Sequence, residues 1–90
     1  MILTAIELDP ILNILPYFGE NYIIKPRLDE NEDGEYYTIV IEYNPPESVY
    51  ENGEVEEFRN SRKQMATNYL INQGIKLDEY VIEETFAINR

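Results

Sequence analysis

The spacing of apolar residues changes near residue 56 of this chain of 90 residues, and that change constrains its fold more than any other feature. From Glu35 to Tyr43 the residues alternate between two faces, which indicates a β-strand with one face in the core. The face assigned to the core holds Tyr37, Ile39, Ile41 and Tyr43. From about residue 56 to residue 73 the apolar residues instead follow a period near 3.6, which predicts one long helix. Strands combined with a long helix in a chain of this length predict an α+β fold.

A hairpin is predicted to join this strand to the one before it. Residues 22–28 have the pattern of a strand, and Pro26, which has no N–H to donate, places that strand at a sheet edge. With Asp33-Gly34 as a two-residue turn, Leu28 lies opposite Ile39, so that apolar residues meet on one face.

Turn-forming residues lie at two points in the segment between this hairpin and the long helix. Asn44-Pro45-Pro46 ends the strand, and Asn52-Gly53 predicts a second hairpin between residues 48–51 and 54–57. That hairpin sets Glu51 against Glu54, a like-charge pair that lowers stability.

Both ends of the chain leave alternatives open. Asp9-Pro10 has the pattern of an N-cap and a first helical residue, which predicts a short helix there, with a helix from about residue 3 as the alternative. Residues 1–8 fit either helix or strand, and the alternation of residues 80–88 favours a strand over a helix. We therefore expect one α+β domain, residues 1–90, with a small antiparallel sheet of three to five strands, hairpins near 33–34 and 52–53, one long helix at about 56–73 and a short N-terminal helix.

The composition removes most catalytic chemistry. The chain contains no cysteine and no histidine, so it lacks the thiolate nucleophile, the commonest general base and the commonest metal ligands. It also lacks the motifs of phosphate loops and nucleophile elbows. We predict that the protein is not an enzyme, has no catalytic residue and uses no cofactor.

One segment matches half of a metal site. Residues 29–34, with the sequence DENEDG, fit the first half of a calcium-binding loop, but Val40 stands where the loop requires a bidentate glutamate. A solvated hairpin turn explains the same residues, so no metal site is predicted.

Negative charge is concentrated in one third of the chain. The formal net charge is −11, and residues 28–58 hold eleven acidic residues without a lysine or arginine. Such a stretch opposes direct binding of nucleic acid and of anionic membranes, and it favours a basic protein partner. The alternative is a charged surface that only keeps the protein in solution.

Tyrosines within the acidic stretch add contact area of the kind found at protein interfaces. If two acidic hairpins lay together, their carboxylates would form an array as dense as nucleic-acid phosphates. The residues predicted to bind the partner are Asp29, Glu30, Glu32, Asp33, Glu35, Tyr36, Glu47, Tyr50, Glu51, Glu54, Glu56 and Glu57.

A small basic cluster follows the acidic stretch. Arg59, Arg62 and Lys63 lie on the predicted long helix, near its N-terminus, where the helix dipole disfavours cations. We expect these residues to pair with Glu56 and Glu57.

In size and charge the chain resembles the small acidic proteins with which bacteriophages inhibit nucleases and CRISPR effectors. The resemblance implies an inhibitor that mimics nucleic acid and occupies the basic surface of a nucleic-acid-binding enzyme. The alternatives are an antitoxin, immunity or adaptor protein that binds a basic partner without mimicry, and an accessory subunit with a merely solubilising surface. The opening MILTAIELDP has no basic region before its apolar run, and no apolar stretch approaches the roughly 18 residues of a membrane span, so we expect a cytoplasmic protein.

Overall fold

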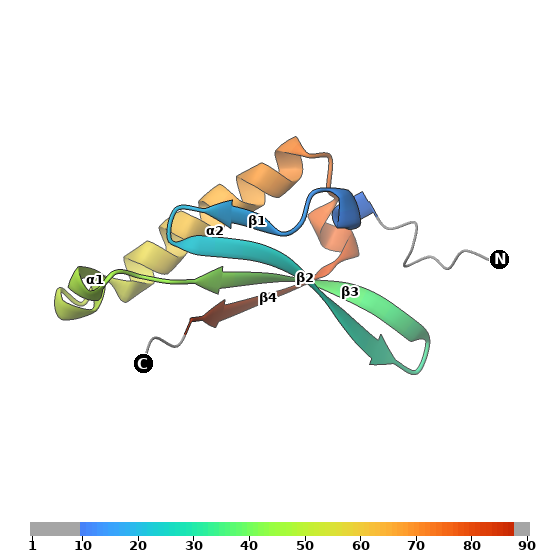
Figure 1. Cartoon of the computed structure of the whole chain (residues 1–90), viewed down its shortest axis with the longest axis horizontal. Coiled ribbons are helices and arrows are strands. Elements are labelled where there is room, and N and C mark those ends of the chain that lie inside the picture. Colours follow the sequence, from blue (N-terminus) through green and yellow to red (C-terminus); the bar gives the residue numbers. More distant parts are fainter. Residues whose placement is uncertain (1–9, 88–90) are drawn as a thin grey trace.

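The computed structural model describes residues 10–87, which form one four-stranded sheet with helices. The predicted α+β class is confirmed (Figure 1). The strands lie in the order β1-β2-β3-β4 across the sheet. In chain order the elements are the 3-10 helix η1 (Pro10–Asn13), β1 (Tyr17–Gly19), β2 (Tyr22–Asn31), β3 (Gly34–Tyr43), α1 (Glu47–Glu51), α2 (Val55–Asn72), the 3-10 helix η2 (Leu77–Glu79) and β4 (Val81–Phe86).

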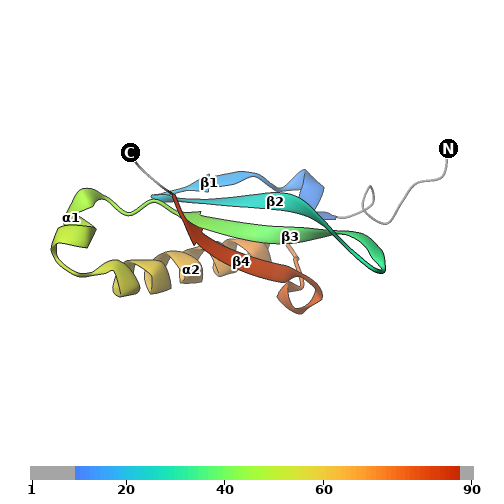
Figure 2. The same ribbon diagram turned by 90° about the horizontal axis from the view of Figure 1, so that it is seen from below.

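The molecule is elongated, with principal extents of 53 × 28 × 19 Å. Helix α2 crosses one face of the sheet, and the other face carries no described helix (Figure 2). The turn between β2 and β3 lies at one end of the long axis, and α1 lies at the other (Figure 1). No helix within residues 10–87 has the length and apolar character needed to cross a membrane.

The core lies between α2 and the sheet face that the alternation of β3 assigned to it. Ile39, Ile41 and Tyr43 are each 0% exposed, and Tyr37 is partly buried at the margin of the same cluster. Helix α2 contributes Phe58, Ala66 and Leu70 to this core. The long helix is therefore confirmed, with bounds within one residue of those predicted.

The first hairpin forms with its turn one residue earlier than predicted. The two turn residues are Glu32 and Asp33, and Gly34 begins β3 with a φ of 122°. The side chain of Asn31 accepts a hydrogen bond of 2.8 Å from the Asp33 N–H, which favours this turn. Leu28 consequently lies opposite Tyr37 and not Ile39. Because the register moves by two residues, every side chain keeps its predicted face.

The prediction that β2 is an edge strand is wrong, because β2 lies second in the order, between β1 and β3. Strand β1, however, pairs only with residues 22–24 of β2, so its pairing does not reach Pro26. The Asn44 N–H donates to the Asn21 carbonyl, so odd-numbered residues of β2 direct their N–H toward β3 and Pro26 directs its nitrogen away from β3. The proline thus costs the sheet no hydrogen bond.

The second hairpin is also wrong, because residues 47–51 form α1 and Asn52-Gly53 joins α1 to α2. Gly53 has a φ of 68°, which suits a turn between helices as well as one between strands. The helical arrangement places Glu47 in the first turn of α1, where the helix dipole favours an acid. It also removes the cross-strand repulsion between Glu51 and Glu54 that a hairpin would impose.

The last strand forms as predicted but runs parallel to β3, so the sheet is mixed and not purely antiparallel. Its register runs from Thr38 opposite Val81 to Tyr43 opposite Phe86. Helix α2 carries the chain back along the sheet, and parallel pairing follows from such a crossover.

The expected short N-terminal helix is present as η1, which begins at Pro10. The predictions for residues 1–8, the cap at Asp9 and the end of the alternation at Ile88 lie outside the described residues.

Candidate functional site

The residues predicted to bind a partner fall into two groups in the structure. One group belongs to the β2–β3 hairpin, and the other belongs to α1 and the start of α2. The hairpin group is Asp29, Glu30, Glu32, Asp33, Glu35 and Tyr36, and the helix group is Glu47, Tyr50, Glu51, Glu54, Glu56 and Glu57.

The hairpin group lies on a two-stranded extension of the sheet, residues 28–37, which we call the acidic arm. Strand β1 pairs with β2 only up to Ile24, and β4 pairs with β3 only from Thr38 onward. The arm therefore has no described neighbour on either edge. Its exposed acids, which we call the arm acids, are Glu30, Glu32, Asp33 and Glu35. Glu30 lies directly opposite Glu35, a like-charge pair that repels across the strands.

The helix group surrounds the turn between α1 and α2. Its exposed acids without an ion pair among the described residues, which we call the helix-end acids, are Glu47, Glu51, Glu54 and Glu57. Glu56 is different because it pairs with Arg59 at 2.9 Å. Tyr50 is 50% exposed and lies between these acids on α1.

The structure does not bring the two groups together. They lie at opposite ends of β3, whose ten residues span roughly 30 Å. The single dense array expected from two adjacent hairpins is therefore wrong, since one of the hairpins does not form.

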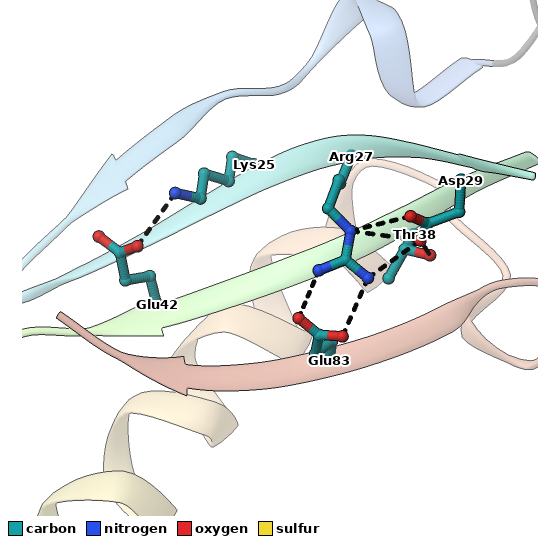
Figure 3. Close-up of polar contacts among 6 residues, drawn as sticks. All are labelled: Lys25, Arg27, Asp29, Thr38, Glu42 and Glu83. Atoms are coloured by element: carbon teal, nitrogen blue, oxygen red, sulfur yellow. Dashed lines mark hydrogen bonds and ion pairs between the residues drawn. The ribbon is translucent and has the colours of Figure 1, made fainter.

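Between the two ends, the open face of the sheet carries a network of paired charges (Figure 3). The Arg27 guanidinium donates to Asp29 on its own strand and to Glu83 on β4. Lys25 pairs with Glu42 at 3.0 Å. The hydrogen bond from Arg27 lowers the pKa of Glu83, and the bonds from Arg27 and then Thr38 lower the pKa of Asp29.

This network shows that two acids of the acidic stretch are paired within the molecule. Asp29 and Glu42 count among the eleven acids, yet bases from outside residues 28–58 neutralise both. Asp29 is therefore the predicted partner-binding residue least able to meet a partner, because Arg27 and Thr38 already occupy its oxygens. Tyr36 lies opposite Asp29 and is half-buried.

A second cluster of charges lies on the helix side, around Glu84 of β4. Its carboxylate accepts hydrogen bonds from the Tyr43 hydroxyl at 2.8 Å and from Arg59 at 2.7 Å, and it pairs with Lys63 at 3.3 Å. Burial raises the pKa of Glu84, but these partners together outweigh it and hold the pKa below the ordinary value of 4.5. Burial and the bond to Glu84 raise the pKa of the Tyr43 phenol.

The basic cluster of α2 is thus used mostly within the molecule. Arg59 pairs with Glu56 as predicted and also with Glu84, while Lys63 pairs with Glu84. Arg62 donates to the backbone carbonyl of Glu20 and lies over the Phe58 ring at 4.5 Å.

The segment that matched half of a calcium loop forms the end of β2, the turn and the start of β3. Among the described residues, no group of three or more carboxylates is arranged to hold a metal ion.

Sequence reasoning missed the internal roles of Glu83 and Glu84. The signal that was available is the order strand, long helix, strand over residues 34–86, because two strands joined by a helix pair in parallel. That order is compatible with a parallel pairing that places both glutamates beside β3, but it does not by itself fix which strand is the neighbour. Comparison of the chain with models of protein families, with curated proteins and with solved structures gives no match.

Proposed function

We propose that this protein is a non-catalytic inhibitor that binds the basic, nucleic-acid-binding surface of a partner protein. One observation carries the proposal: the eight arm acids and helix-end acids are exposed, have no ion pair among the described residues and gather at the two ends of the molecule. By contrast, five other acids are paired with Lys25, Arg27, Arg59 and Lys63; they are Asp29, Glu42, Glu56, Glu83 and Glu84.

The gathering of unpaired acids at the two ends lowers the stability of the isolated protein. Like charges crowded at each end, such as Glu30 opposite Glu35, repel one another and lower stability. A surface that served only solubility would be satisfied by mixed charges. Contact with lysines and arginines of a partner would relieve the repulsion and would speed association by steering.

The separation of the two ends supports mimicry of a duplex in particular. The ends lie roughly 30 Å apart along β3. One turn of duplex DNA measures about 34 Å, the spacing at which dimeric DNA-binding proteins contact two successive half-sites. Each acidic end therefore matches one basic patch of such a protein, and the neutral sheet spans the gap.

The proposal is tested first by finding the partner and then by competition. The immobilised protein is exposed to a cell lysate, washed at rising salt, and the retained proteins are identified by mass spectrometry. A purified partner is then titrated with the protein in the presence of labelled nucleic acid. We expect displacement of the nucleic acid and an affinity that falls with salt.

Three variants that each remove three charges locate the contact. Glu30→Gln with Glu32→Gln and Asp33→Asn neutralises the arm; Glu47→Gln with Glu51→Gln and Glu54→Gln neutralises the helix end. The matched control is Glu20→Gln with Asp78→Asn and Glu79→Gln, three exposed acids outside both groups. Association with the partner at low salt should slow about tenfold in the first two variants and change little in the control.

The other two functional classes correspond to different results. A partner that keeps its nucleic acid while bound to the protein identifies an antitoxin, immunity or adaptor protein, and rejects mimicry. Equal binding by all three variants shows that the acids only solubilise the protein, and rejects the proposal as a whole.

A further inference from the structure

The outer edge of β4 presents backbone groups that no described strand pairs with. The Ala87 N–H donates to the Tyr43 carbonyl, so the odd-numbered residues of β4 direct their backbone groups toward β3. Ile82, Glu84 and Phe86 therefore direct their N–H and C=O groups away from the sheet. Strand β4 is last in the sheet order, and no described strand lies beyond it (Figure 1).

This edge lacks the backbone devices that often prevent strand addition, and its two charged residues, Glu83 and Glu84, are engaged in ion pairs within the molecule. Edge strands are usually interrupted by proline, a bulge or lysine. The sequence of β4, VIEETF, has no proline, glycine or lysine, and its register with β3 is unbroken over six residues. The opposite side of the sheet differs, because β1 covers only residues 22–24 of β2 and Pro26 removes a donor from the part of β2 that β1 leaves uncovered.

The charged side chains of the β4 edge are already paired within the molecule. Glu83 pairs with Arg27, and Glu84 pairs with Arg59 and Lys63. Beyond each end of the strand the charge is strongly negative, because Val81 begins where the acidic arm leaves the sheet and Phe86 ends beside the Tyr43 end of β3 that leads to α1. The edge is thus a strip of paired charges between two ends whose acids are unpaired among the described residues.

We infer that β4 accepts an extended segment of the partner as a fifth strand, with a core of about five or six uncharged residues and with lysines or arginines at both ends. This inference rests on the proposed function and names the element of the partner that is recognised. Backbone hydrogen bonds to Ile82, Glu84 and Phe86 hold the core of the segment, while the arm acids and the helix-end acids meet its basic ends.

A second copy of this chain does not fit the same edge. Antiparallel addition of another β4 would reverse the long axis of the copy, and its acidic arm would lie at the same end as the helix-end acids of the first molecule. Each copy carries a net charge of −11, so like charges would meet at both ends. Charge complementarity therefore selects a basic segment.

A synthetic peptide of sequence KKVTVTVKK, capped at both ends, is the probe. It is titrated into the ¹⁵N-labelled protein, and amide hydrogen exchange is followed by NMR with and without saturating peptide. We expect the N–H groups of Ile82, Glu84 and Phe86 to exchange at least about tenfold more slowly, while those of Glu83 and Thr85, already bonded within the sheet, change little. This alternation is the signature of an added strand.

Two control peptides separate strand addition from charge attraction. SSVTVTVSS keeps the core without the basic ends, and KKVTVTVKK with N-methyl groups on every core residue keeps the charge without the backbone donors. Both should bind at least about tenfold more weakly than the probe.

Other outcomes overturn the inference and leave the proposed function to its own competition assay. Shifts confined to the arm and the helix end, with no protection at β4, would mean that the peptide binds by charge alone. Equal binding of the N-methylated peptide, protection of β2 in place of β4, dimerisation through β4, or no binding of the probe would each contradict it.

Discussion

At the scale of single residues, Glu84 joins three elements. It lies on β4, and its partners are Tyr43 of β3 and Arg59 and Lys63 of α2. Such a carboxylate fixes the long helix against the sheet edge, because removing it takes an acceptor from two cations and a hydroxyl, of which Arg59 still has Glu56.

Replacing Glu84 by Gln should lower the free energy of unfolding by about 1–3 kcal/mol at neutral pH, since a charged acceptor of three donors is lost. The folded-state pKa of Glu84 lies below 4.5, so its contribution is complete above that pH and is lost as the pH falls through the lower folded value. The difference between wild type and variant, measured by urea unfolding from pH 7 downward, should therefore shrink in acid.

The matched control is Glu79→Gln, an exposed acid of η2, which should change stability by no more than about 0.5 kcal/mol. A cost for Glu84→Gln that is unchanged at a pH well below 4 would show that the charge of Glu84 is not responsible.

The two contacts of Arg59 show what a sequence can reveal at this scale. Its pairing with Glu56 was predictable, because residues three apart on a helix are neighbours. Its pairing with Glu84 was not predicted, because it depends on which strand lies under the helix and in which direction that strand runs.

At the scale of elements, strong periodicity predicted β3, β4 and α2, whereas residues 48–51 were wrongly predicted as a strand and lie in α1. Asn-Gly is a signal of reversal, but it does not say whether strands or helices flank the turn. The mixed sheet was missed because alternation within a strand identifies its faces and not its neighbour.

The short strand β1 depends on glycine at position 19. Gly19 pairs with Tyr22, whose ring is 3% exposed and occupies the space that a side chain at position 19 would need. Gly19→Ala should lower stability by about 1–3 kcal/mol in thermal melts, because the buried ring cannot move aside freely.

A double-mutant cycle with Tyr22→Val checks the cause. In the background of the Tyr22→Val variant, the same Gly19→Ala change should cost little, since the ring has been removed. An equal cost in both backgrounds would place the effect in the backbone and not in the contact with Tyr22.

The acidic arm should be the least stable part of the sheet. Two strands without neighbours are only marginally stable, and Glu30 repels Glu35 across them. In the free protein we expect the amides of residues 29–36 to exchange faster than those of residues 38–42 on β3, by hydrogen exchange with NMR detection. Uniform protection along β3 would contradict this expectation.

At the scale of the whole molecule, the two acidic ends are independent sources of self-repulsion. They lie roughly 30 Å apart, and the screening length at 0.1 M salt is about 10 Å. The arm variant should therefore raise the melting temperature at low salt. The helix-end variant should gain less, because it also loses the favourable interaction of Glu47 with the dipole of α1, and the two changes in free energy should add within about 0.5 kcal/mol when combined.

Both gains should shrink as salt is added, because ions screen the same repulsion. Thermal melts of the two variants, their combination and the Glu20/Asp78/Glu79 control at low and high salt test this expectation. Strong coupling between the two ends would contradict this expectation. Gains in stability that persist at high salt would also contradict it, because the substitutions would then not act by relieving repulsion within each end.

The elongated shape has a hydrodynamic consequence. The radius of gyration is 14.9 Å, whereas a compact chain of 90 residues has a value of about 12 Å. A single chain of 10.6 kDa should therefore elute from a gel-filtration column ahead of globular standards of equal mass. Gel filtration would therefore overestimate its mass. The stoichiometry of its complexes should be measured by light scattering or sedimentation equilibrium, because these methods give a mass that does not depend on shape.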